Sequence, residues 1–345
     1  MSQLQNKRVL LIGGAGFIGH NLALHLKDHG ADVSIIDGLN VNNLMYVHST
    51  DIDMPNREMY IGFINERLNL LRHASIPLHV VDARNYFKIS KVISTYKPTH
   101  IVLLAAVAHA NRSNKDPYET FDHSLRTLEN ALDAIKAEKY LERFIYFSSS
   151  MIYGNFNDQA VTEDSPCNPL GVYGNLKFSG ERMVLSYHQA FEVPYTIVRP
   201  SALYGERCIS RRVGQVFIES AIMGQSINIQ GDGSDRLDFT YIGDLVAGVR
   251  NIIESPKSLN ETFNITYGQG RSIAEMAEII KENFPEIKIN YKPKDKLMPD
   301  RGTLSVAKAA DLIGYNPQYP LEKGYVNYIN WYKSMFTDKK EFASV

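Results

Sequence analysis

One short stretch near the start of the chain, RVLLIGGAGFIG from Arg8 to Gly19, constrains the fold more than any other. It is typical of an apolar strand that runs through a glycine turn into a helix. The first glycine of the turn permits a sharp bend, the second lets backbone approach a pyrophosphate, and the third allows close helix packing. The unpaired N–H groups that begin the helix suit an anion. We therefore expect dinucleotide contacts from Gly13, Gly16, Phe17, Ile18 and Gly19.

Apolar strands and helices alternate through the first half of the chain. Strands are expected at 9–12, 32–36, 78–81, 100–104 and 143–147, and helices at 17–30, 86–96 and 118–136. This order predicts an α/β fold with a Rossmann-type, doubly wound parallel sheet. A long segment, 38–77, interrupts it and contains a short helix around GFINERLNLLRHA. That segment could cover the adenosine end of a cofactor or contribute to a larger assembly.

Residues at the ends of the strands suit a nicotinamide dinucleotide. Asp37 lies 18 residues beyond Gly19, where a carboxylate accepts the ribose hydroxyls of adenosine and repels a 2′-phosphate. This favours NAD over NADP, although Asp37 could instead cap the next turn. At the next strand end an acid could meet the adenine amino group, and the small residues after the fourth strand leave room for a flat ring or simply pack tightly. These further cofactor candidates are Asp82, Ala83, Leu104, Ala105 and Ala106.

A serine-ended strand and a Tyr-x-x-x-Lys pair indicate alcohol oxidation. The strand 143–147 runs into Ser148, Ser149 and Ser150, and Tyr173 precedes Lys177 by one helical turn. A nearby ammonium lowers the pKa of a phenol, so we expect the tyrosine to accept a proton from an alcohol. A serine hydroxyl could hold the reacting oxygen.

Composition excludes several other classes of protein. The 37 basic and 38 acidic residues nearly cancel, which argues against nucleic acid and membrane surfaces as partners. Two cysteines provide neither a disulfide framework nor a zinc site, so no metal is expected and a cytoplasmic location is favoured. We see no signal peptide and no apolar run long enough to cross a bilayer.

Linked motifs along essentially the whole chain resemble the extended short-chain dehydrogenase/reductase family, specifically its nucleotide-sugar epimerases and dehydratases. They are GGAGFIG, LLAAVAHANRS, FSSSMIYG, YGNLK, VRPSALYG, GDGSDRLDFTYIGDL and SVAKAADLIGYNP. The resemblance implies a Rossmann domain for NAD or NADP, a smaller C-terminal α/β domain for the nucleotide sugar, and a homodimer formed through helices near 118–136 and 173–190. The expected NAD-binding domain is 1–198 with a returning segment at about 240–265, the nucleotide-sugar domain is 199–239 with 266–336, and 337–345 is a tail.

The resemblance also assigns roles at the reaction centre. Tyr173 matches the catalytic base, Lys177 its partner that holds the nicotinamide ribose, and Ser149 the catalytic hydroxyl. Ser148 and Pro200 are further cofactor candidates. Dehydratases of the family follow the catalytic serine or threonine with an Asp-Glu pair, whereas this chain has Ser150 and Met151. We therefore do not expect 4,6-dehydration.

The chain departs from the family pattern at cofactor and substrate positions. An asparagine of the family is His123 here, a glycine is Arg126, a second asparagine is Ala202, and the arginine at 236 is displaced by one place. The arginines after Tyr204 suit a diphosphate. The run from Gly205 to Val213 and the segment around His109 are similar to those of GDP-mannose dehydratases, so a GDP-linked sugar is weakly favoured. The substrate candidates are His109, Ser150, Met151, Arg207, Arg211, Arg212, Arg236 and Arg301.

These observations favour NAD-dependent oxidoreduction at C4 of a nucleotide-activated sugar, of the kind that supplies precursors of surface polysaccharides. A 4-epimerase is the leading hypothesis, because family frequency favours it. A 4-dehydrogenase or 4-keto reductase acting on a hexose or heptose shares the first step. A non-catalytic NAD-binding sensor is the remote alternative, since it would not need the Tyr173–Lys177 pair.

Overall fold

The computed structural model describes residues 4–49, 54–107, 110–156, 160–293 and 299–340. Its largest element is a seven-stranded sheet with the order β10-β6-β5-β4-β1-β2-β3, in which every neighbouring pair is parallel. This confirms the doubly wound Rossmann-type sheet. The strands are β1 (Arg8–Ile12), β2 (Asp32–Asp37), β3 (Leu78–Val80), β4 (His100–Leu103), β5 (Arg143–Phe147), β6 (Tyr195–Arg199) and β10 (Glu261–Asn264).

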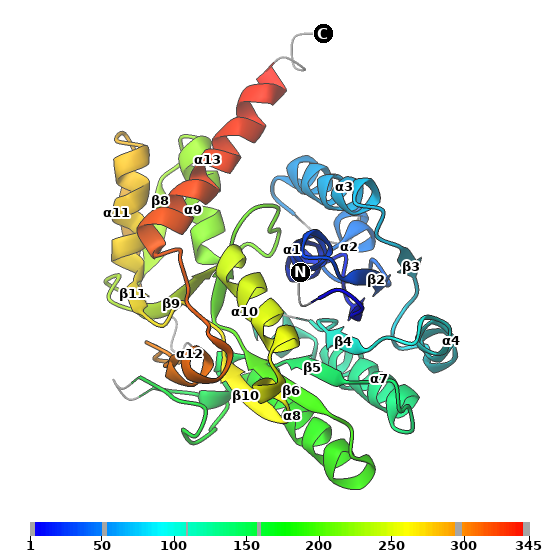
Figure 1. Ribbon diagram of the computed structural model, residues 1–345. Helices are drawn as coiled ribbons and strands as arrows, with labels where there is room; N and C mark the ends of the chain where they lie inside the picture. Colours follow the sequence, from blue (N-terminus) through cyan, green and yellow to red (C-terminus); the bar gives the residue numbers. More distant parts are fainter. Residues whose placement is uncertain (1–3, 50–53, 108–109, 157–159, 294–298, 341–345) are drawn as a thin grey trace.

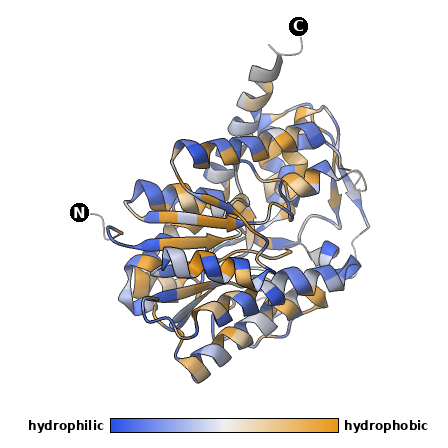
Figure 2. Cartoon of the chain, turned by 90° about the vertical axis from the view of Figure 1, so that its right-hand side faces the viewer, coloured by the Kyte–Doolittle hydropathy of each residue, from blue (hydrophilic) through white to orange (hydrophobic). Residues whose placement is uncertain are grey.

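Helices cover both faces of this sheet (Figure 1). Side chains of α1 (Phe17–Asp28) and α10 (Ile242–Glu254) pack in one apolar core, and those of α4 (Tyr86–Tyr96), α7 (Thr127–Ile135) and α8 (Gly171–Phe191) in another. The sheet strands are mainly apolar, whereas the helices alternate between apolar and polar positions (Figure 2). This is the pattern of a parallel sheet buried on both faces.

A second part of the chain forms smaller sheets and a separate core. Strands β7 (Ala202–Tyr204), β9 (Arg236–Tyr241) and β11 (Gly270–Ser272) form one sheet, and β8 (Ile227–Gln230) pairs with β12 (Ile289–Lys292). The helices here are α9 (Val213–Ile222), α11 (Ile273–Asn283), α12 (Ala307–Ile313) and α13 (Leu321–Lys340). The predicted domain boundaries stay a prediction, but the returning segment does place β10 beside β6.

The insertion between β2 and β3 belongs to this second core. It contains α2 (Leu44–His48) and α3 (Arg57–His73), which is longer than the helix expected from the sequence. Apolar residues of α3 pack with residues of α9 and α13, and the rings of Phe63 and Trp331 lie 4.6 Å apart. The insertion therefore joins the N-terminal sheet to the C-terminal part of the chain.

Two helices differ in detail from their predictions. The helix expected at 118–136 is α6 (Pro117–Phe121), a π-turn (Asp122–Arg126) and α7, preceded by α5 (Ala110–Lys115). The helix α13 continues to Lys340, so the first residues of the predicted tail are helical, while 341–345 lie outside the described residues. Short 3-10 turns occur at Ser150–Tyr153 and Pro256–Ser258.

Candidate active site

A cavity opens at the carboxyl edge of β1, β2, β3 and β4. Its walls come from the glycine turn, from the ends of these strands, from the π-turn before α7, and from the segment after β7. Eleven of the residues predicted to contact the cofactor line it: Gly13, Gly16, Phe17, Ile18, Gly19, Asp37, Asp82, Ala83, Leu104, Ala105 and Ala106. The topology places them together because parallel strands end at one edge of the sheet.

The glycine turn fits a dinucleotide. Gly13 has a φ of +87°, and a Cβ there would lie 2.6 Å from the backbone nitrogen of Ala105. A Cβ on Gly19 would lie 2.5 Å from Cα of Gly14, so only glycine allows this close packing. At Gly16, which precedes the first residue of α1, a Cβ would meet nothing nearer than 3.4 Å. The start of α1 is thus open to an anionic group.

Asp37 holds the backbone of the glycine turn. Its two carboxylate oxygens accept hydrogen bonds from the N–H groups of Ala15, at 2.9 Å, and Leu39, at 2.7 Å. Burial raises the pKa of Asp37, and those two bonds and the charge of Arg67 oppose the increase. The capping role that we considered as an alternative is therefore present, and the ribose role stays a prediction.

Arg67 is a cavity residue that the sequence did not reveal. It lies on α3, is fully buried, and donates from Nε to the carbonyl oxygen of Arg207 at 2.9 Å. No local motif surrounds it, and its role depends on how the insertion packs. A buried guanidinium beside the cavity adds positive charge to the cofactor site.

Asp82 has a different environment from the one expected. Its carboxylate accepts hydrogen bonds from the Arg84 guanidinium, including one of 2.7 Å, and from Asn40 at 3.3 Å. Arg84 also donates to Asp122 at 2.9 Å and lowers the pKa of Asp82. An adenine contact by Asp82 would have to share the carboxylate with Arg84. Beside this ion pair, the π-turn places His123 in the cavity wall, a position typical of functional π-turns.

The predicted catalytic residues lie at the end of β5 and on α8. The Ser149 hydroxyl lies close enough to the phenol of Tyr173 to lower its pKa. Lys177 is buried, and its ammonium donates to the carbonyl oxygen of Phe147 at 2.7 Å. The Ser148 hydroxyl is buried and has no hydrogen-bond partner among the described residues, as a group awaiting a ligand would be. The fold therefore brings the serine, tyrosine and lysine to one place.

The electrostatics at Tyr173 differ from the prediction. Burial raises the pKa of Tyr173, while the charges of Arg212 and Arg301 and the nearby hydroxyl of Ser149 act to lower it. Lys177, which we expected to lower that pKa, is not among these groups. Instead, burial lowers the pKa of Lys177 itself to about 8, and the nearby charge of Glu181 opposes this.

Three arginines predicted to bind substrate are engaged elsewhere. Arg207 donates to Glu66 at 3.0 Å and to His20, also at 3.0 Å. Arg211 donates to the Tyr60 hydroxyl at 2.9 Å, and Arg236 is exposed and bonds the carbonyl oxygen of Gly270 at 2.5 Å. These contacts hold the three guanidinium groups against other parts of the chain, and their role toward a diphosphate stays a prediction.

The other substrate candidates divide into three groups. Arg212 lines the cavity, and Arg301 donates to Sδ of Met151 at 3.5 Å. Ser150 is buried, with its hydroxyl 3.3 Å from that of Ser201, and its N–H bonds the carbonyl oxygen of Pro200 at 2.9 Å. His109 lies outside the described residues.

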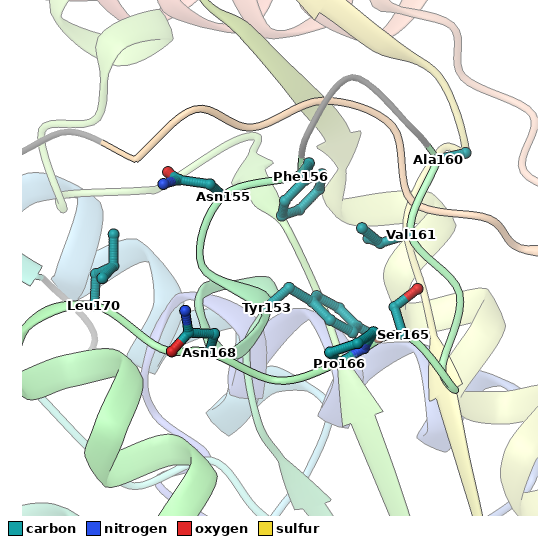
Figure 3. A pocket seen from close by; sticks show the side chains of 9 residues that line it. All are labelled: Tyr153, Asn155, Phe156, Ala160, Val161, Ser165, Pro166, Asn168 and Leu170. Atoms are coloured by element: carbon teal, nitrogen blue, oxygen red, sulfur yellow. The ribbon is translucent and has the colours of Figure 1, made fainter.

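A second cavity, of about 380 Å³, is lined by residues between Tyr153 and Leu170 (Figure 3). Asn168 and Leu170 lie on one side of the view and Val161 and Ser165 on the other. None of its described lining residues is charged, so we place the chemistry in the first cavity and at the adjacent Ser149–Tyr173 pair. No helix in the described ranges is long and apolar enough to cross a membrane.

Known proteins are similar to this chain in sequence and in fold. The sequence model of the NAD dependent epimerase/dehydratase family matches residues 9–266. A putative UDP-glucose 4-epimerase of Methanocaldococcus jannaschii is 31% identical, over 94% of this chain and 98% of that protein. An uncharacterized UDP-glucose epimerase of Bacillus subtilis, YtcB, is 27% identical, over 95% and 99%.

A solved structure adds the cofactor to these comparisons. The UDP-glucuronic acid 4-epimerase of Bacillus cereus, in complex with UDP-glucuronic acid and NAD, is 25% identical with a TM-score of 0.83. The match covers 95% of this chain and 99% of that one. The chain belongs to the NAD dependent epimerase/dehydratase family, as an NAD-dependent enzyme of the extended short-chain dehydrogenase/reductase type.

Proposed function

We propose that this enzyme is a nucleotide-sugar 4-epimerase. The observation that carries the proposal is the proximity of the Ser149 and Tyr173 hydroxyl groups, beside a cavity with a dinucleotide-type glycine turn. A phenol that can take a proton and a hydroxyl that can hold the reacting oxygen are what oxidation of a secondary alcohol requires. A non-catalytic sensor would need neither group.

The residues have separate tasks in this mechanism. Tyr173 takes the proton of the C4 hydroxyl, and Ser149 donates a hydrogen bond that holds the oxygen. Lys177 and Ser148 would hold the nicotinamide ribose, and the open start of α1 would receive the pyrophosphate. NAD, when bound, supplies the hydride acceptor. Epimerisation further requires that the sugar present its other face before C4 is reduced again.

The same centre argues against dehydration and for a uridine nucleotide. Ser150 and Met151 occupy the places where dehydratases of the family carry two acids, so no carboxylate base stands there. The preference for GDP rested on the run that contains Arg211 and Arg212 and on the segment around His109, and Arg211 is bonded to Tyr60 and Glu219. The names of the relatives described above specify UDP-sugars. We therefore propose a UDP-linked sugar, with Arg212 as a contact to its diphosphate.

A panel of UDP-, GDP- and dTDP-sugars, incubated with the enzyme and NAD, tests this function. NADH absorbance and C4 stereochemistry are followed together. Inversion at C4 without net NADH is the expected result. Net NADH with a 4-keto product would instead establish a dehydrogenase, and reduction of a 4-keto sugar by added NADH would establish a reductase.

We also propose that the enzyme is a homodimer that uses α6 and α8. Aromatic side chains on these helices are unusually exposed: Tyr118 to 86%, Phe121 to 47% and Phe191 to 46%. Exposed aromatic side chains are enriched at protein interfaces. We expect Tyr118→Glu to convert a dimer to a monomer in analytical ultracentrifugation, while Tyr291→Glu, at a 57% exposed tyrosine on β12, leaves the dimer intact. A monomeric wild-type protein at micromolar concentration would contradict this proposal.

A further inference from the structure

Arg301 is a partly buried cation whose charge the described part of the chain does not balance. Within the described residues, the one hydrogen-bond acceptor of its guanidinium is the thioether sulfur of Met151, at 3.5 Å. A thioether is a weak acceptor. The charged groups that act on Arg301 are a second arginine, Arg212, and the phenol of Tyr173. Burial and the repulsion from Arg212 lower the pKa of Arg301 to about 10, still high enough to keep the cation at neutral pH.

The position of Arg301 identifies which part of a substrate it faces. Met151, its partner, donates its backbone N–H to the Ser149 hydroxyl at 3.2 Å, and both Ser149 and Arg301 are near enough to Tyr173 to lower its pKa. Arg301 is therefore tied to the end of the site where the C4 hydroxyl would react. An anion there would lie on the sugar ring next to C4, and C5 with its C6 substituent is the neighbour that can carry one.

The local charge also favours a negative sugar. The acids that dehydratases of the family carry at the places of Ser150 and Met151 would repel a carboxylate, and this chain has a hydroxyl and a thioether instead. A guanidinium binds a carboxylate through two parallel hydrogen bonds. The site thus combines a guanidinium whose acceptor among the described residues is a thioether with uncharged side chains at 150 and 151.

We propose that the sugar is a hexuronic acid and that Arg301 binds its C6 carboxylate. This inference rests on the proposed function for the identity of the reacting carbon. It assigns the two arginines near Tyr173 to different groups, Arg301 to the sugar carboxylate and Arg212 to the diphosphate. It makes the enzyme selective for uronic acids over neutral hexoses through one residue.

UDP-glucuronic acid and UDP-glucose form the test pair, because they share a nucleotide and differ only at C6. Binding is measured by calorimetry on the NAD-loaded full chain, and C4 inversion is measured separately. We expect the wild type to prefer the uronic acid at least about tenfold, and Arg301→Gln to reduce that preference by about 10- to 100-fold, the range for a hydrogen bond to a charged group. Arg301→Lys should restore part of it. Arg271→Gln, at an arginine paired with Glu275 and Glu322, should leave the preference unchanged.

The outcomes separate this inference from the proposed function. If Arg301→Gln weakened the binding of both UDP-sugars equally, or if the wild type had no preference between them, the uronic acid assignment would be overturned even if C4 is inverted. Binding of the uronic acid that depends on Arg301, without C4 inversion, would support the assignment and reject the epimerase. If neither UDP-sugar binds, GDP-mannose and GDP-mannuronic acid replace them, and failure of both pairs overturns the assignment.

Discussion

In the proposed mechanism Ser149 has two tasks, to hold the substrate oxygen and to stabilise the phenolate of Tyr173. Its nearby hydroxyl, together with the charges of Arg212 and Arg301, opposes the rise in the Tyr173 pKa that burial causes. The deprotonated tyrosine is the proton acceptor in the proposed reaction. The rate of alcohol oxidation should therefore rise with pH as Tyr173 loses its proton.

Ser149→Ala should lower this rate and move its pH dependence. Burial raises the pKa of Tyr173, and the Ser149 hydroxyl opposes that increase. Without this hydroxyl the pKa of Tyr173 increases, and the rise in kcat/KM shifts to higher pH. We expect kcat to fall by about 10²- to 10³-fold, as for loss of one donor to a reacting oxygen. Full pH–rate profiles of both proteins measure the shift. An unchanged profile would remove Ser149 from contact with the base.

Lys177 introduces a pH-dependent cost to stability. Burial lowers its pKa to about 8 in the folded protein, below the ordinary value of 10.5. Between these two values the unfolded chain holds a proton that the folded chain has released, so stability rises with pH across this window. Below it both states are protonated, and the cost of the buried charge, about 3 kcal/mol, is present in full.

Lys177→Met should remove that dependence. From about pH 8 to about pH 9.5 the wild type should gain on the order of 2 kcal/mol in unfolding free energy relative to the variant. Urea unfolding of both proteins at several pH values gives the difference, in which the other titrating groups cancel. A constant difference across this range would show that the pKa of Lys177 is not lowered.

At the scale of elements, a buried carboxylate ties the insertion to the C-terminal helices. Glu219 on α9 is 2% exposed and accepts hydrogen bonds from the Tyr60 hydroxyl on α3 at 2.7 Å and from the Tyr332 hydroxyl on α13 at 2.9 Å. Gln215 and Arg211 also donate to it, at 2.7 and 3.3 Å. Three elements distant in sequence therefore share one acceptor.

Tyr60→Phe should destabilise the protein by about 2 kcal/mol, because a hydrogen bond to a buried charged group is lost. Urea unfolding measures the change. Tyr291→Phe, which alters a largely exposed tyrosine, should have no measurable effect. Equal stability of the two variants would show that Glu219 does not hold the insertion.

The sequence predicted the elements around the site better than the contacts between distant parts. The glycine turn, the ends of the strands and the Tyr173–Lys177 spacing are local signals, and each has the predicted place in the fold. Arg207 pairs with Glu66 and Arg211 with Glu219, and no local sequence pattern predicts either ion pair. Arg67 was missed for the same reason.

The π-turn before α7 shows a second limit of sequence-based prediction. The periodicity at 118–136 predicts a helix, and the chain is helical there, but an extra residue in one turn carries His123 into the cavity wall. Helical periodicity does not distinguish an α-turn from a π-turn. The departure of His123 from the family pattern was the one available sign.

At the scale of the whole molecule, the site lies where the two parts of the chain meet. The large sheet provides the glycine turn and the catalytic residues, and the segments around Arg212 and Arg301 come from the C-terminal part. The insertion packs into the second core and holds the segment after β7 through Arg67. Elements from the whole chain thereby bring together the residues predicted to bind the cofactor and the substrate.

Replacement of Tyr173 by Phe tests the central claim most directly, because it removes the proton acceptor and little else. We expect the variant to bind NAD with an affinity within about threefold of the wild type, while C4 inversion falls by about 10²- to 10⁴-fold, the usual contribution of a general base. Calorimetry and the stereochemical assay, on protein with an unchanged melting temperature, give both values. A variant that inverts C4 at the wild-type rate would contradict the proposed mechanism.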